Sequence, residues 1–276
     1  MTAYCSSSGA VIGFATLSRQ GARDYNEDAC GYWTSDLGAC FVVSDGAGGH
    51  GGGDVASETV VKTFLSGFSR SPSLNKVNVD SLLQKADAAV RYGQTLSDGL
   101  ERMSATVAGL FLSQDALRAQ WVHLGDTRIY LIRRQKCHLL TKDHSLLQRI
   151  IDSGVMSEHE AQKKVARSVL YAALGTGESV PSASLSKPFE VKEGDAFLIC
   201  TDGFWEDLSY TALISSLSLA SCAEEWLARL EQEVIRINSP SQDNYSGLAV
   251  WVGSPNDITV SWTEGFNSTT EETVYK

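Results

Sequence analysis

The stretch from residue 105 to residue 140 constrains the fold most strongly. It contains four apolar runs rich in β-branched and aromatic residues, separated by only a few residues each. Connections this short can join antiparallel strands, whereas parallel strands need a crossover of about a dozen residues or more. This part of the chain is therefore predicted to form antiparallel strands. The four runs are ATVAGLFL, LRAQWVHL, TRIYLIRR and KCHLL.

The remaining elements place paired helices beside these strands. Apolar residues recur at three- and four-residue steps in four further segments, which predicts amphipathic helices. Asp143 and Ser157 are the predicted N-caps in the third of them. Runs of strands together with pairs of helices indicate an α+β layered fold rather than alternating βαβ units. The helices are predicted over residues 53–68, 79–96, 143–164 and 221–237, and further strands over 10–17, 29–33, 39–44, 194–203 and 246–252.

The composition limits the partners. The formal net charge of −10 over 276 residues repels phosphate, which argues against broad binding to nucleic acid or to an anionic membrane. No apolar run approaches the ~18 residues that span a bilayer, and no secretory signal is recognisable at the N-terminus. None of the six cysteines forms a C-x-x-C pair, which favours free thiols in a reducing compartment. We therefore expect a cytoplasmic protein, and a monomer.

A glycine-rich loop, FVVSDGAGGHGGGD at residues 41–54, could wrap a nucleotide, wrap a metal or form a plain surface turn. Gly46, Gly48 and Gly51 match the dinucleotide pattern G-x-G-x-x-G between a strand and a helix. Two observations disfavour a nucleotide. The strands that follow are antiparallel rather than parallel, and the Asp45 carboxylate would face a pyrophosphate.

Acidic residues recur beside the predicted strands. Asp45 and Asp202 follow apolar strands, Asp243 precedes one, and Glu27 with Asp28 precedes another. Each alone is an ordinary turn residue. Together they would repel one another unless a cation lay between them. Ligands that are all oxygen suit Mg²⁺ or Mn²⁺ rather than zinc.

Eight motifs in a fixed order resemble those of the metal-dependent Ser/Thr protein phosphatases (the PPM family, type 2C), in their bacterial form. The resemblance runs from about residue 10 to residue 252. Each motif alone is a modest signal, but eight in the family's order are specific. They read GARDYNED, VSDGAGGHGGGD, MSATVAGLFL, VHLGDTRIYLIR, LTKDHSLLQRIIDSGVMSEHEA, LYAALG, LICTDGFWEDLS and QDNYSGLAVWV.

The resemblance implies an α+β fold of two stacked antiparallel β-sheets flanked by helices, an α-β-β-α sandwich with a helical flap insertion. Residues 1–252 would form the catalytic domain, and residues 143–170 its flap. The polar segment 253–276 would be a poorly ordered C-terminal tail.

The resemblance also implies a centre of two Mn²⁺ or Mg²⁺ ions. Asp45 would bridge the two ions, and the Gly46 carbonyl would contribute to one of them. Asp202 and Asp243 would complete the site of the other ion. Glu27 and Asp28 would hold metal-bound waters.

Three further positions follow from the same motifs. Arg23 matches the arginine that grips the substrate phosphate. Glu101 stands near the place of a family aspartate that serves a third, weaker metal, which it would hold together with Asp202. Ala47 stands where eukaryotic relatives carry a histidine thought to protonate the leaving group, so the general acid is left open between a metal-bound water and another group.

Several residues are expected to be structural or solvated. His50 and His144 are assigned to loop or cap roles, and Asp126 is expected to pack beneath the sheet end. Asp257 mimics the last motif, but Asp243 is preferred because an asparagine and an apolar strand follow it. Structural or solvated roles are also expected for His123, His138, His159 and Arg128.

The function implied by the resemblance is hydrolysis of phosphoserine and phosphothreonine on proteins. Phosphoprotein substrates and a cognate Ser/Thr kinase, or its targets, would be the partners. The main rival is a catalytically silent pseudophosphatase that acts as a regulatory binding module, and the second is a nucleotide-binding enzyme.

Overall fold

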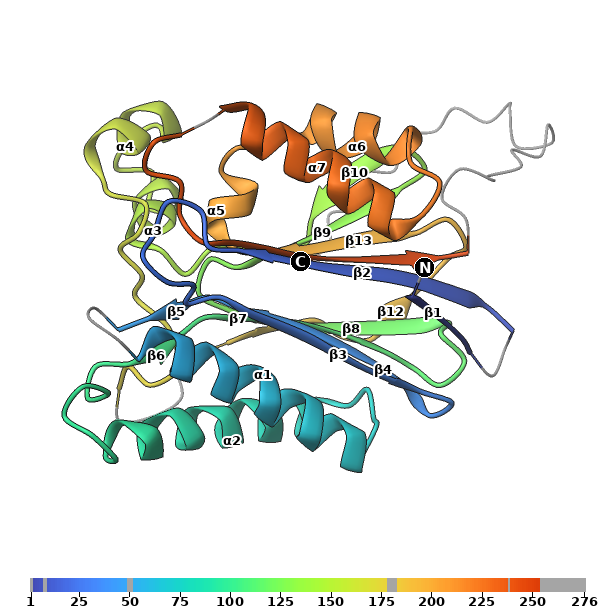
Figure 1. Ribbon diagram of the computed structural model, residues 1–276, viewed down its shortest axis with the longest axis horizontal. Coiled ribbons are helices and arrows are strands. Elements are labelled where there is room, and N and C mark those ends of the chain that lie inside the picture. Colours follow the sequence, from blue (N-terminus) through green and yellow to red (C-terminus); the bar gives the residue numbers. More distant parts are fainter. Residues whose placement is uncertain (1, 7–8, 49–51, 178–182, 238, 254–276) are drawn as a thin grey trace.

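Two antiparallel sheets stack on one another, and helices cover both outer faces (Figure 1). The computed structural model describes residues 2–6, 9–48, 52–177, 183–237 and 239–253. The antiparallel pairing predicted over residues 105–140 is present as consecutive hairpins on both sheets. The predicted α+β sandwich is therefore confirmed.

The first sheet has the strand order β1-β2-β14-β13-β9-β10. Its centre is the long pairing of β14 with β2, which begins where Tyr245 lies opposite Arg19. This register brings the two chain segments that flank Asp243 and Arg23 to the same sheet end. The strands are β1 (Thr2–Cys5), β2 (Val11–Arg19), β9 (Arg128–Arg133), β10 (Lys136–Leu139), β13 (Ala196–Cys200) and β14 (Tyr245–Val252).

The second sheet has the order β11-β8-β7-β4-β3, and β12 also pairs with β8. Every residue of β4 and β7 is buried, as expected for strands covered on both faces. The strands are β3 (Ala29–Ser35), β4 (Gly38–Ser44), β7 (Val107–Leu112), β8 (Arg118–Leu124), β11 (Ser184–Leu185) and β12 (Phe189–Glu190). A separate short pair, β5 (Gly46–Ala47) with β6 (Ser104–Ala105), carries the start of the glycine loop.

The helices bury one face each against the sheets. Helices α1 (Gly53–Arg70) and α2 (Lys76–Gln94) cover the second sheet, while α6 (Tyr210–Ser218) and α7 (Ala223–Ile237) cover the first (Figure 1). Phe64 and Phe68 of α1 and Trp226 of α7 are fully or almost fully buried. Helix α6 and the short α5 (Asp202–Trp205) were not predicted from the sequence. None of the helices in the described part of the chain is both long and apolar enough to cross a bilayer.

The predicted helix 143–164 is two short helices, α3 (Leu146–Asp152) and α4 (Glu158–Lys164). Ser157 caps α4 with a complete capping box, as predicted. The prediction that Asp143 caps α3 was wrong, because Ser145 is the N-cap. Asp143 instead accepts two hydrogen bonds, from Arg128 Nε at 2.9 Å and Nη2 at 2.7 Å. This pair joins the start of the flap to β9.

One end of the sandwich collects the acidic segments. Strand β4 ends at Ser44, opposite the first residue of β3, and β13 ends at Cys200, beside the start of β14. Asp45 and Asp202 each follow a strand end, and Asp243 and Asp28 each precede a strand start. The sheet registers therefore bring four carboxylates from distant parts of the sequence to one place.

A buried ion pair at the first sheet supplies a test of the fold. The Asp195 side chain is fully buried, accepts from Arg133 Nε at 2.7 Å and Nη2 at 2.6 Å, and accepts from the Lys192 N–H at 2.8 Å. Asp195→Ala should lower the free energy of unfolding by about 2–4 kcal/mol, because Arg133 loses its partner in a mostly buried place. Lys62→Ala removes an exposed pair and should cost at most about 0.5 kcal/mol in the same urea titration. Equal effects of the two substitutions would contradict this account.

Candidate metal centre

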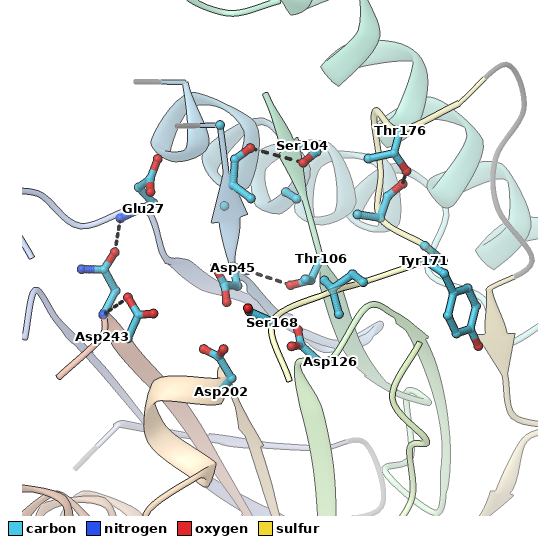
Figure 2. Close-up of a pocket in the computed structure, with 18 of the residues that line it drawn as sticks. Glu27, Asp45, Ser104, Thr106, Asp126, Ser168, Tyr171, Thr176, Asp202 and Asp243 are labelled. Carbon is cyan, nitrogen blue, oxygen red and sulfur yellow. Dashed lines mark hydrogen bonds between the residues drawn. The ribbon is translucent and has the colours of Figure 1, made fainter. Parts of the chain in front are cut away.

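A cavity of about 570 Å³ opens at this sandwich end, and carboxylates from five segments line it (Figure 2). Asp45, Asp202 and Asp243 lie around its floor. The other side is formed by residues of the segment that follows α4, among them Ser168, Leu170 and Tyr171. Further lining residues include Arg23, Glu27, Gly46, Ala47, Thr106, Asp126 and Thr176.

Asp45 is held through its backbone. Its N–H donates to Thr106 Oγ1 at 2.9 Å, and its carbonyl oxygen accepts from the Thr106 N–H at 2.8 Å. The Thr106 hydroxyl is in turn 2.6 Å from the Thr127 hydroxyl, both of them buried. These bonds fix the backbone of Asp45, whose side chain lines the cavity.

Gly46 follows in a position that admits no side chain. A Cβ at this position would collide with the Gly53 carbonyl oxygen. The Gly46 N–H donates to the Glu27 carbonyl at 3.2 Å. The need for glycine therefore comes from close packing of the loop against α1 and residue 27. This packing fixes the loop in which the sequence predicts a metal-binding carbonyl.

Two carboxylate oxygens beside the cavity are buried and have no hydrogen-bond partner. They are Glu27 Oε1 and Asp28 Oδ1. The other oxygen of Asp28 accepts from Thr201 Oγ1 at 2.9 Å. Buried polar atoms without a partner are rare and costly, and a bound ion with its waters is one way to satisfy them.

Burial and the charges of neighbouring carboxylates raise the pKa values of Asp28, Asp45 and Asp202. Loss of solvent, followed by the charges of Asp202 and Asp243, raises the pKa of Asp28 to about 7. Burial and the neighbouring Asp243 raise the pKa of Asp202 to about 6. Burial also raises the pKa of Asp45 well above its ordinary value, with Asp28 the next largest cause. A cation would reverse this effect, because it favours the charged form of each carboxyl.

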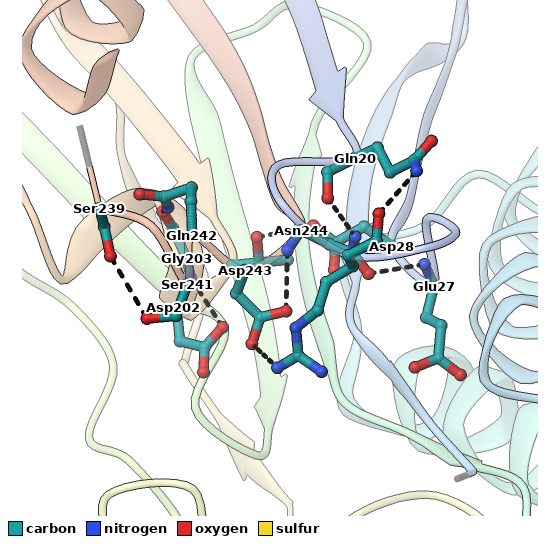
Figure 3. A network of polar contacts seen from close by, with 12 residues as sticks. Gln20, Glu27, Asp28, Asp202, Gly203, Ser239, Ser241, Gln242, Asp243 and Asn244 are labelled. Carbon is teal, nitrogen blue, oxygen red and sulfur yellow. Dashed lines mark hydrogen bonds and ion pairs between the residues drawn. The ribbon is translucent and has the colours of Figure 1, made fainter. Parts of the chain in front are cut away.

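The residue types fit a divalent cation, since the donors are carboxylate and carbonyl oxygens. Within the described residues, however, no three acidic, histidine or cysteine side chains are already grouped as ligands of a single ion. Asp243 instead pairs with Arg23, whose Nη2 lies 2.6 Å from Asp243 Oδ2 (Figure 3). The predicted ligands thus share one cavity but are not yet arranged around one point.

The structure differs from the sequence-based prediction at the expected third metal site. Glu101 is exposed on the turn after α2, and it does not line the cavity. Asp126, which was expected to pack beneath the sheet end, does line the cavity and is buried. Burial and then the charge of Asp202 raise the pKa of Asp126 well above its ordinary value. The geometry therefore favours Asp126 over Glu101 as the acid that accompanies Asp202.

Asn244 is a residue whose role the sequence did not reveal. Its amide donates to the Gln20 carbonyl at 2.7 Å and to the Tyr25 carbonyl at 2.9 Å, and its Oδ1 accepts from the Glu27 N–H at 2.9 Å (Figure 3). This one side chain ties the loop that carries Arg23 and Glu27 to Asp243. The only sequence signal was its position directly after Asp243.

The histidines take structural positions where they are described. His144 accepts from the Gly125 N–H at 3.1 Å and holds the loop before Asp126. His123 is fully buried beside it, and burial lowers its pKa to about 3. His138 and His159 are exposed. His50 and Asp257 lie outside the described residues.

Known proteins share this arrangement. The family model "Protein phosphatase 2C" matches residues 17–242. The Ser/Thr protein phosphatase PstP of Mycobacterium tuberculosis is 30% identical in an alignment of 258 residues that covers 91% of this chain. The serine/threonine phosphatase stp of Listeria monocytogenes is 30% identical over 188 residues, covering 66% of this chain and 73% of that relative. The chain spans only 44% of the length of PstP.

Solved structures agree with the sequence comparison. The catalytic domain of PstP in complex with two manganese ions aligns with a TM-score of 0.74 at 26% identity, covering 88% of this chain and 99% of that one. PppA of Pseudomonas aeruginosa aligns with a TM-score of 0.70 at 26% identity, covering 87% and 97%. A two-sheet sandwich with a carboxylate-lined cavity at its end defines the class of metal-dependent protein phosphatases. This chain belongs to the protein phosphatase 2C family.

The raised pKa values predict how stability depends on pH when metal is removed. The folded protein holds protons on Asp28 and Asp202, with pKa values of about 7 and 6, that the unfolded chain releases from about pH 4 upward. In EDTA the melting temperature should therefore fall by several degrees as the pH rises from 5.5 to 7.5, and Mn²⁺ should restore it; 1 kcal/mol corresponds to roughly 2–4 °C in a domain of this size.

Two variants control this measurement, made by thermal unfolding at several pH values. Asp202→Asn should flatten the dependence, because it removes one of the titrating groups. Asp36→Asn, on an exposed turn between β3 and β4, should leave the dependence unchanged. A melting temperature in EDTA that stays constant or rises over this range would contradict the prediction.

Proposed function

We propose that this protein hydrolyses phosphoserine and phosphothreonine on proteins, using a water activated by two divalent cations. The observation that carries the proposal is the convergence of Asp45, Asp202 and Asp243 in one open cavity beside Arg23. Membership of the protein phosphatase 2C family supports it. The relatives PstP and stp are Ser/Thr phosphatases, and the catalytic domain of PstP has been solved with two manganese ions.

Each residue has a proposed part in holding the ions. Asp45 would be shared between the two, with the Gly46 carbonyl on one side and Asp202 with Asp243 on the other. Two such cations would supply the charge that lowers the pKa of a water and neutralises the phosphoryl oxygens. Asp126 with Asp202 is the pair we propose for a third, weaker ion.

The remaining residues would position the water and the phosphate. Glu27 and Asp28 each carry a buried oxygen without a partner, so they can accept hydrogen bonds from water at the cavity wall. Arg23 presents a guanidinium that can bind phosphate through two parallel N–H donors. Ala47 offers no proton, so the leaving serine or threonine oxygen would receive its proton from water.

The substrate would be a phosphorylated protein segment. The cavity is open and bordered by Ser168 and Leu170 at the end of the proposed flap and by Tyr171 directly after it, which could contact residues on either side of the phosphorylated one. We propose a cytoplasmic monomer that reverses a partner Ser/Thr kinase. The alternative of a pseudophosphatase is disfavoured because every carboxylate expected at the two-metal centre is present in the cavity or directly beside it.

The central test is phosphate release from a phosphopeptide and from p-nitrophenyl phosphate. Turnover should require Mn²⁺ or Mg²⁺ and stop in EDTA, because no side chain in the proposed site replaces the cations. Asp45→Asn should lower kcat by more than ten-fold, or about 1.4 kcal/mol, since it removes the shared charge but keeps the shape. Asp54→Asn is the matched control, because Asp54 lies in the first turn of α1, directly after the glycine loop, and is exposed and does not line the cavity.

Two results would overturn the proposal. Full turnover of a preparation with metal content near zero would exclude the cation-activated water. No turnover by the folded, Mn²⁺-loaded wild-type protein on any phosphopeptide would instead favour the pseudophosphatase.

A second prediction concerns the binding of the substrate phosphate. Arg23→Ala should raise KM about ten-fold or more and lower kcat less, because a charge-assisted contact worth roughly 1.5–3 kcal/mol is lost from the bound substrate in both ground and transition states. Steady-state kinetics with a phosphopeptide measures both constants. An unchanged KM would exclude the phosphate-binding role, and Arg19→Ala, which breaks an exposed pair with Glu231, should leave both constants unchanged.

A further inference from the structure

Arg23 lies against a predicted metal ligand, in a position fixed by its loop. The loop from Gln20 to Tyr25 is bound to the segment of Asp243 through the Asn244 amide, and the Ala22 N–H donates to the Gln242 carbonyl at 2.8 Å. Gly21 has a φ of +62°, and a Cβ there would collide with the Asp243 carbonyl. The two segments are therefore held together, and the backbone of Arg23 is kept beside Asp243.

Both carboxylate oxygens of Asp243 are already engaged. Oδ2 accepts from Arg23 Nη2 at 2.6 Å, and Oδ1 accepts from the Asn244 N–H at 2.8 Å. This agrees with the finding that, among the described residues, no three acidic, histidine or cysteine side chains surround a common point. The positive charge of Arg23 therefore competes with a cation for the Asp243 carboxylate.

The pair is weak enough to exchange. The side chains of Arg23 and Asp243 are 57% and 39% exposed, and exposed pairs of this kind contribute little to stability. A phosphate dianion is a stronger partner for a guanidinium, because it presents more charge and can accept two parallel hydrogen bonds. Arg23 therefore has two alternative anionic partners at the same cavity, one from the protein and one from the substrate.

We propose that the Arg23 side chain exchanges its partner, from Asp243 to the substrate phosphate, and that this transfer of the guanidinium couples metal binding to phosphate binding. In the metal-free protein, the Arg23 guanidinium is paired with Asp243 and is not available to phosphate. When Asp243 binds a cation instead, the Arg23 guanidinium is released and can bind phosphate. This inference rests on the metal-binding part of the proposed function, but it does not require turnover.

Two consequences follow for binding. Removing Arg23 should make Asp243 a better metal ligand, because a competing cation is lost. Inorganic phosphate should bind the wild-type protein weakly without metal and more tightly with it, since only then is Arg23 free. A residue that only grips phosphate would leave the metal affinity unchanged, and a residue that only positions Asp243 would lower it when removed.

The test is isothermal titration of Mn²⁺ into the metal-free wild-type, Arg23→Ala and Arg19→Ala proteins, without substrate. Arg23→Ala should bind Mn²⁺ about two- to five-fold more tightly than the wild type, the range that an exposed ion pair spans. Arg19→Ala is the matched control, because it removes an arginine of similar exposure whose partner, Glu231 at 2.7 Å, is not in the cavity. Its Mn²⁺ affinity should equal that of the wild type.

Equal or weaker Mn²⁺ binding by Arg23→Ala would overturn the proposal, as would equal gains in the two variants. If Arg23→Ala fails to fold, NMR of the assigned Arg23 Nε–H group in the wild type gives the same answer. Its signal should shift on adding Mg²⁺ and shift again on adding inorganic phosphate; no response to Mg²⁺ would contradict the transfer. Because neither measurement depends on hydrolysis, loss of the proposed activity and failure of this inference are distinguishable.

Discussion

Electrostatic repulsion among carboxylates at one end of two stacked sheets is the constraint on which the rest of the site depends. Asp28, Asp45 and Asp202 all have raised pKa values, first because they are withdrawn from water and then because other carboxylates lie near them. Such a cluster costs stability unless protons, cations or an arginine offset the charge. This chain has a feature that corresponds to each of the three. The raised pKa values favour bound protons, the oxygen donors suit divalent cations, and Arg23 pairs with Asp243.

The surrounding structure opposes this repulsion by fixing backbone rather than side chains. Thr106 binds both backbone polar groups of Asp45, and Asn244 binds the backbone on either side of Arg23. Gly46 lets loops approach more closely than any side chain would allow. The scaffold thus brings the carboxylates to one cavity through contacts of the backbone.

The sequence predicted most of the strands and the longer helices, because their periods are local properties of the chain. It failed at Asp143 and at Asp126 for one reason. Arg128 binds Asp143 through two hydrogen bonds and lies 3.3 Å from the centre of the Trp205 ring, whose Nε1 donates to the Asp126 carbonyl at 3.0 Å. These contacts join β9, α5 and the flap, and no spacing within a single segment encodes them.

The sequence alone determined the antiparallel α+β class, the family and the set of acids expected at the site. Strand periodicity and motif order can be recognised in a sequence without knowledge of its contacts. Only the tertiary structure decided that Asp126, rather than Glu101, lies in the cavity with Asp202. It also decided that Arg23 pairs with Asp243. Arg23 and Asp243 are 220 residues apart, and Asn244 reaches a carbonyl 224 residues away. Such pairings are set by the register of β14 on β2, which places the two loops side by side, and that register exists only once the sheets have formed.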